Sequence, residues 1–192
     1  MIKGVIGNIN GLPREKMTGA VETIDYGHHE IHEGESYTLS LNDPSLGIDE
    51  TLIAAFKTPN TPNKWVHLIA LVNTSGAAKF DTLEAPTITV DTGSDLTVFN
   101  RERNSTNISG VKTIETIPEV GEVTQDPTIT DDGTILRTDS LGVGNNKTPG
   151  ETRDVSEWIL KEDTIYAFRL TSLATGNIVQ MNLIWYEFIN RE

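Results

Sequence analysis

Short apolar segments recur along the chain, and turn-forming residues separate them. Val, Ile, Thr and aromatic residues dominate the segments, while Gly, Pro, Asn, Asp and Ser dominate the connections. This pattern is typical of many β-strands joined by turns. It predicts an all-β protein with strands at 24–32, 36–41, 51–57, 65–73, 79–83, 87–90, 96–100, 111–117, 128–130, 134–138, 157–160, 164–170 and 178–186.

Period-two alternation is clearest in the last two predicted strands. Each has an apolar face made of every second residue: Tyr166, Phe168 and Leu170 in the first, and Val179, Met181, Leu183 and Trp185 in the second. Such alternation indicates one face against a core. The connection 171–177 ends in Gly176 and Asn177, which predicts a hairpin loop between these strands.

Two further patterns concern strand pairing. Asp132-Gly133 is a two-residue hairpin signal between the predicted strands 128–130 and 134–138. Residues 65–72 are almost continuously apolar, as expected of a strand covered on both faces. Together the elements predict a single antiparallel β-sandwich, most simply a jelly roll.

Length and charge narrow the class of protein. A chain of 192 residues fits one domain. The net charge is −13; residues 1–20 carry Lys3, Arg14 and Lys16 against Glu15, or +2, which leaves −15 for the rest. We predict an extended N-terminal arm over 1–20 that orders on a partner and a β-sandwich domain over 21–192. The acidic body argues against nucleic acid as a partner, because phosphates would be repelled.

Other simple features exclude further classes. There is no cysteine, so disulfides and thiolate chemistry are absent. The longest uninterrupted aliphatic run, Leu68 to Val72, is far shorter than the ~20 residues of a membrane helix, so we expect no membrane association.

The sharpest enzymatic motif is Asp91-Thr92-Gly93-Ser94, between apolar residues on both sides. It resembles the catalytic turn of pepsin-like and retroviral aspartic proteases. That chemistry needs two carboxylates sharing a proton, and the chain has no second Asp-Thr-Gly or Asp-Ser-Gly. Only a dimer could supply the pair through Asp91. The favoured interpretation is a hairpin turn, which the same residue types also predict.

Residues 28–33, His-His-Glu-Ile-His-Glu, could offer ligands to a metal. In a strand, His28, Glu30 and His32 would share a face; in a helix, His28 or His29 would pair with His32 or Glu33. A polar strand face or an interface histidine cluster is favoured over a metal site. The acidic residues Asp126, Asp131, Asp132 and Asp139 match no known calcium loop. We therefore assign no metal, cofactor or catalytic residue.

Two polar or aromatic groups could bind partners. Residues 101–107 form a polar loop with Arg101 and Arg103, which could pair with carboxylates of a neighbouring subunit or simply be a solvated turn. The aromatic residues Trp65, Trp158, Trp185 and Tyr186 could stack on a sugar, as in a carbohydrate-binding β-sandwich of a phage fibre or tail, although tryptophans in strands are more often core.

Several segments taken together resemble a family of virion structural proteins of tailed bacteriophages, the capsid auxiliary or decoration proteins. The resemblance rests on 28–34, 58–61, 64–67, 100–107 and 157–161, and on Thr164, Tyr166, Arg169, Thr171, Ser172, Asn177 and 185–187. It covers residues from about Gly27 to Phe188. The acidic stretch 114–125 and the arm before Ala20 have no counterpart in it.

The resemblance implies a non-enzymatic jelly-roll protein on the capsid exterior of the virion, made in the host cytoplasm. It implies the major capsid protein as partner and a homotrimer as the assembly. It brings no catalytic residues with it, so none are assigned.

Overall fold

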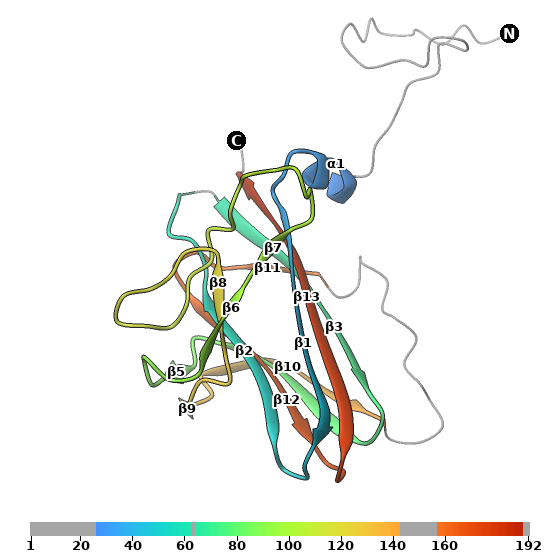
Figure 1. Ribbon diagram of the computed structural model, residues 1–192. Helices are drawn as coiled ribbons and strands as arrows, with labels where there is room; N and C mark the ends of the chain where they lie inside the picture. Colours follow the sequence, from blue (N-terminus) through green and yellow to red (C-terminus); the bar gives the residue numbers. More distant parts are fainter. Residues whose placement is uncertain (1–25, 63, 143–156, 190–192) are drawn as a thin grey trace, which may run out of the picture.

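The computed structural model describes residues 26–62, 64–142 and 157–189 and is almost entirely β (Figure 1). The predicted arm at 1–20 lies outside the described residues. In chain order the elements are α1 (Tyr26–His32), β1 (Ser36–Leu46), β2 (Thr51–Lys57), β3 (Lys64–Thr74), β4 (Ala78–Glu84), β5 (Thr87–Ile88), β6 (Ser94–Thr97), β7 (Phe99–Asn100), β8 (Glu122–Gln125), β9 (Ile129–Asp131), β10 (Thr134–Leu141), β11 (Trp158–Leu160), β12 (Ile165–Ser172) and β13 (Asn177–Ile189).

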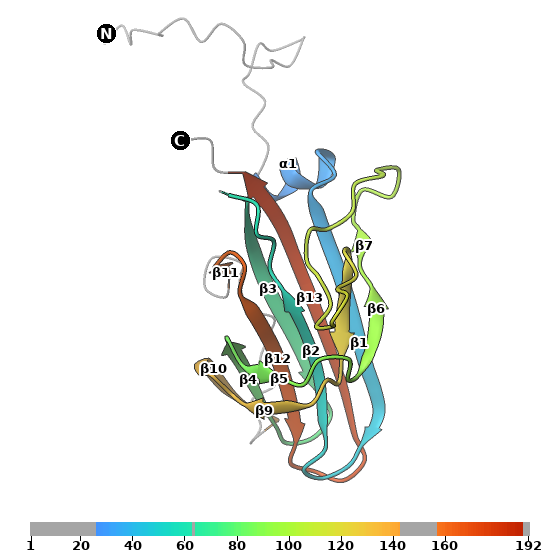
Figure 2. The ribbon, with the colours of Figure 1, turned by 90° about the vertical axis from the view of Figure 1, so that its left-hand side faces the viewer.

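Two antiparallel sheets pack face to face and form the sandwich. One has the order β11-β3-β13-β1-β7, and the other β10-β4-β12-β2-β8-β6. Eight strands, β1 to β4 and β10 to β13, alternate between the two sheets in chain order, except that β4 and β10 are paired neighbours in the six-stranded sheet. This alternation is the topology of a jelly roll, and it confirms the predicted fold class. Figure 2 shows β1, β13 and β3 side by side as the longest strands.

The core lies between the sheets and follows the predicted alternation. The inward-facing residues of β12 and β13 named above are all buried, at 1% exposure or less. The ring of Phe56 on β2 lies 5.9 Å from that of Phe168 and 6.0 Å from that of Trp185, centroid to centroid, so aromatic stacking joins the two sheets.

The prediction of a strand at 24–32 is wrong, because residues 26–32 form helix α1. Gly34 ends this helix with φ of +72°. The amide of Glu35 donates to the carbonyl of Glu30, and that of Gly34 to Ile31, a Schellman C-cap that needs a residue of positive φ. Glycine in this position is the local signal that favoured helix over strand.

Both predicted hairpins are also wrong. The connection 173–176 carries the chain from β12 in one sheet to β13 in the other, and these strands do not pair. Likewise β9 pairs with β5, while β10 pairs with β4 across the register Thr134↔Glu84 to Leu141↔Ala78. The turn residues Gly176-Asn177 and Asp132-Gly133 correctly predicted the positions at which the chain turns. They did not predict that the bend would lead to another sheet, because the sheet is chosen by long-range packing.

The remaining differences are at strand edges. Residues 111–117 form no strand apart from an isolated bridge at Lys112, and β8 at 122–125 was not predicted. In β3, Val66 and Leu68 are buried, but His67, Ile69 and Leu71 on the opposite face are only half-buried. The apolar run of β3 therefore reflects one core face and one partly exposed face.

Candidate functional site

Residues 85–133, here called the insertion, join β4 to β10 and contain β5 to β9. β7 extends the first sheet beside β1, and β8 with β6 extends the second beside β2. The insertion thus lies along the side of the sandwich at β1 and β2, as the green to yellow segments of Figure 1 show.

A second, smaller core fastens the insertion to the outer face of the six-stranded sheet. Its sheet side is made of Ile53 and Ala55 on β2, Leu83 on β4 and Ala167 on β12, and its insertion side of Ile88 and Ile114. The carboxylate of Asp126 also accepts a hydrogen bond of 2.7 Å from the amide of Ile53. These contacts make the insertion a fixed part of the domain.

The rest of the insertion exposes large apolar side chains. Ile117 is 81% exposed, Ile108 68% and Phe99 53%, and Val90 and Val120 are about half exposed. Ile117 lies near the tip of the loop 111–121, whose arms are joined by the bridge Lys112↔Val120 and by the amide of Thr113 donating to Glu119. In Figure 1 the loop that leads into β8 projects from the sandwich. Five of the ten exposed large apolar side chains among the described residues lie in this one segment, and such a concentration favours a protein-docking surface.

A buried carboxylate, Glu187, binds the insertion at Ser109 and Gly110. Glu187 on β13 is fully buried and accepts hydrogen bonds from the amide of Gly110, at 2.9 Å to each oxygen, and from the hydroxyl of Ser109. Its other partners are Lys64 Nζ at 3.0 Å and Trp185 Nε1 at 3.3 Å. This network ties the loop 101–110 to the core.

The same network perturbs the ionisation of its neighbours. Burial lowers the pKa of Lys64, but Glu187 and then Glu35 more than offset this, so its net pKa is raised. Burial, opposed by Lys64, raises the pKa of Glu35. The sequence held a signal for Glu187: continuing the alternation two residues beyond Trp185 places a carboxylate on the core face.

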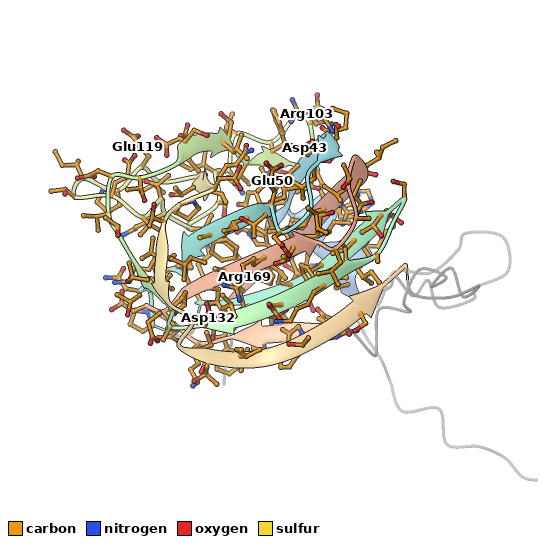
Figure 3. All side chains as sticks on the ribbon, turned by 90° about the horizontal axis from the view of Figure 1, so that it is seen from below. Asp43, Glu50, Arg103, Glu119, Asp132 and Arg169 are labelled. Carbon is orange, nitrogen blue, oxygen red and sulfur yellow. The ribbon has the colours of Figure 1, made fainter. Side chains whose placement is uncertain are left out.

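A second polar network lies on the outer face of the six-stranded sheet. Arg169 donates to both oxygens of Asp132, at 2.7 and 2.8 Å, and to Asp81 at 3.1 Å. Asp81 is fully buried and also contacts Lys79 and Thr138. Figure 3 shows Arg169 and Asp132 next to each other at this face. Asp132, one of the acidic residues weighed as a calcium ligand and not assigned as one, is thus paired with an arginine.

Comparison with protein-family models, curated proteins and solved structures found no match.

Many residues that carry the resemblance to phage decoration proteins have supporting roles in this fold. The hydroxyl of Thr58 donates to the carbonyl of Lys161, and Asn100 Nδ2 to that of Gly34, at 2.6 and 2.7 Å. Asn177 accepts from the amide of Gly76 and donates to Ala77, which joins two loops. Together with Arg169 and Glu187, these residues join loops to strands.

Asp91 lies in an exposed turn with φ of +59°. Its two carboxylate oxygens accept hydrogen bonds from the amide and hydroxyl of Thr116, at 2.8 and 2.7 Å. These bonds lower its pKa and hold both carboxylate oxygens within the turn. The geometry favours the turn, although not as a hairpin, since the flanking strands β5 and β6 pair elsewhere.

Near this turn, Asp95 and Glu115 are in hydrogen-bond contact. The pKa of Glu115 is raised, mainly by desolvation and to a smaller extent by the negative charge of Asp95. Above its ordinary value of 4.5, ionised Glu115 therefore opposes folding. We expect Glu115→Gln to raise Tm slightly at pH 7 and to lose this advantage below pH 4.5. Thermal melts at both pH values, with the exposed Glu119→Gln as control, test this; equal Tm for wild type and Glu115→Gln at pH 7 would contradict it.

The histidine segment does not form the predicted strand face. On α1 the Nε2 atoms of His28 and His32 lie 3.0 Å apart at the surface, and His29 lies 3.8 Å from Glu33, as the helical alternative predicted. Glu30 is buried, on another side of α1. Among the residues that the structure describes, no three His, Asp or Glu side chains are grouped to hold a metal ion.

The aromatic residues do not form an exposed platform. Trp185 and Tyr186 are buried, Trp65 and Trp158 are half-buried, and Trp65 Nε1 donates to Glu162 at 3.0 Å. In the loop 101–107, Arg103 lies over the ring of Phe99, with 5.4 Å from Cζ to the ring centroid. Within the described parts of the chain, no helix is long and apolar enough to span a membrane.

Proposed function

We propose that this protein is a structural component of a tailed-phage virion, a decoration protein that binds the major capsid protein on the capsid exterior and stabilises the lattice. The observation that carries the proposal is the insertion, a rigidly fastened segment that exposes Ile117, Ile108 and Phe99 on a jelly-roll scaffold. The sequence resemblance to phage decoration proteins supports a phage capsid as the lattice that it binds.

Docking through the insertion has a simple physical basis. Burying an isoleucine side chain contributes about 1.5–3 kcal/mol, and the insertion is already ordered by its small core, so little conformational entropy is lost on binding. An assembly of several copies would engage several lattice sites at once. The resulting avidity exceeds the affinity of one copy.

Replacing Ile117 with aspartate should reduce binding to empty capsids of the cognate phage at least about tenfold, because an apolar contact becomes a charge at the interface. Ile117 is almost fully exposed, so the fold should be unaffected. The matched control is Ile48→Asp in the β1–β2 turn, at the end of the sandwich opposite α1 (Figure 1).

Co-sedimentation with capsids measures occupancy for the three proteins. Equal binding of both variants and wild type would remove the insertion as the docking surface. Failure of the wild-type protein to bind capsids at all would remove the proposed function.

A further inference from the structure

The outer face of the five-stranded sheet carries no formal charge along its three long strands. The outward residues of β1 are Ser36, Thr38, Ser40 and Asn42; those of β3 are Trp65, His67, Ile69, Leu71 and Asn73; those of β13 are Ile178, Gln180, Asn182, Ile184 and Tyr186. Ser36 and Tyr186, at the α1 end, are buried, so the accessible part of the face begins at Thr38 and Ile184. They line up in cross-strand rows such as Ser40, Asn182 and Leu71.

The absence of charge on these strands is notable in this chain, which has 15 Lys and Arg and 28 Asp and Glu residues. The corresponding face of the other sheet differs sharply, since it holds Lys79, Asp81 and Arg169. Position on a sheet surface therefore does not explain the lack of charge.

Exposed apolar side chains border the same face, and two charged side chains touch it from its edges: Glu157 lies 3.6 Å from His67, and Arg101 donates to Ser36 at 3.2 Å. Phe99 on β7 pairs with Thr38 at one edge, and Ile159 on β11 pairs with His67 at the other. Ile178 lies at the start of β13. Their exposures, 53%, 59% and 59%, are high for such large apolar residues.

We propose that this face binds a second copy of the same chain. Each copy carries a net charge of −13, so copies repel one another except where they meet through an uncharged surface. The hydroxyl and amide groups of Ser, Thr, Asn and Gln both donate and accept hydrogen bonds. A face made of them is complementary to itself, as a contact between two identical patches requires.

The size of the face fits a modest interface. With strands ~4.8 Å apart and ~3.4 Å per residue, the three long strands measure roughly 15 by 30 Å, or about 450 Å² per copy. Phe99 and Ile159 on the short edge strands add to this area. Stable interfaces bury about 800 Å² per partner, and weaker ones somewhat less. Self-association should therefore be concentration-dependent, and salt should strengthen it by screening the repulsion between copies.

A matched pair of substitutions tests this. Ser40→Glu places a negative charge in the middle of the face, and Ser140→Glu makes the same change at an exposed position of β10 in the other sheet. In sedimentation velocity, wild type and Ser140→Glu should associate alike, while Ser40→Glu should need at least about tenfold higher concentration. Asn182→Glu, in the same row as Ser40, should repeat the effect.

The inference is overturned if wild type keeps the 21.1 kDa mass of one chain up to ~1 mM, if Ser40→Glu and Asn182→Glu associate like wild type, or if salt weakens association. Thermal melts establish that each variant is folded. The assay contains no capsid, so its failure and the failure of the capsid function are separate results.

Discussion

Replacing Glu187 with alanine should lower the free energy of unfolding by about 3–5 kcal/mol, the usual effect of breaking a buried ion pair. The substitution removes the acceptor of the Gly110 amide and the partner of Lys64 and Ser109. Buried or partly buried polar groups would lose these bonds, although Lys64 keeps Glu35 at 3.5 Å. Urea denaturation at pH 7 measures the change.

The control for this variant is Glu119→Ala, the same substitution at an exposed site (labelled in Figure 3). It should change the free energy of unfolding by less than about 0.5 kcal/mol. Glu187→Gln keeps an acceptor for Gly110 and should recover part of the loss. A Glu187→Ala protein as stable as the control would show that the network does not hold the loop 101–110.

Replacing Arg169 with methionine should lower the free energy of unfolding by about 2–4 kcal/mol at pH 7. The change leaves Asp81 fully buried with Lys79 as its one remaining cation and Asp132 without its bidentate partner. The exposed Arg103→Met, which loses the contact with Phe99, should cost less than about 1 kcal/mol. Equal losses for the two variants would contradict the role of Arg169.

The same variant should show a particular pH dependence. Hydrogen bonds from Arg169 lower the pKa of Asp132; burial raises that of Asp81, but bonds from Thr138, Lys79 and Arg169 outweigh it, and the net pKa is lowered. A lowered carboxyl pKa contributes stability that is complete above the ordinary value of 3.8 and is lost as pH falls below it. The difference between wild type and Arg169→Met should therefore shrink below about pH 4.

Some features of the candidate site can be predicted from local sequence patterns, and others cannot. Within the insertion, the sequence predicts short strands, the turn at Asp91 and the polar loop 101–107, and the acidic stretch 114–125 lies outside the resemblance. None of these patterns indicates that Ile117 or Ile108 is exposed. Whether Ile117 or Ile108 is exposed depends on how the insertion packs against the sheet. The small core around Ile88 and Ile114 fixes that packing. The partners of Asp132 and Glu187 lie 37 and 77 residues away in the chain, as Arg169 and Gly110.

The sequence by itself determined the all-β class and the inward faces of β12 and β13, because side chains alternate across a strand whatever its neighbours are. Only the tertiary structure decided which strands share a sheet, that residues 26–32 are helical, and that carboxylates at Asp81 and Glu187 are buried with cations. These outcomes depend on contacts between distant segments, whose energies no local pattern contains.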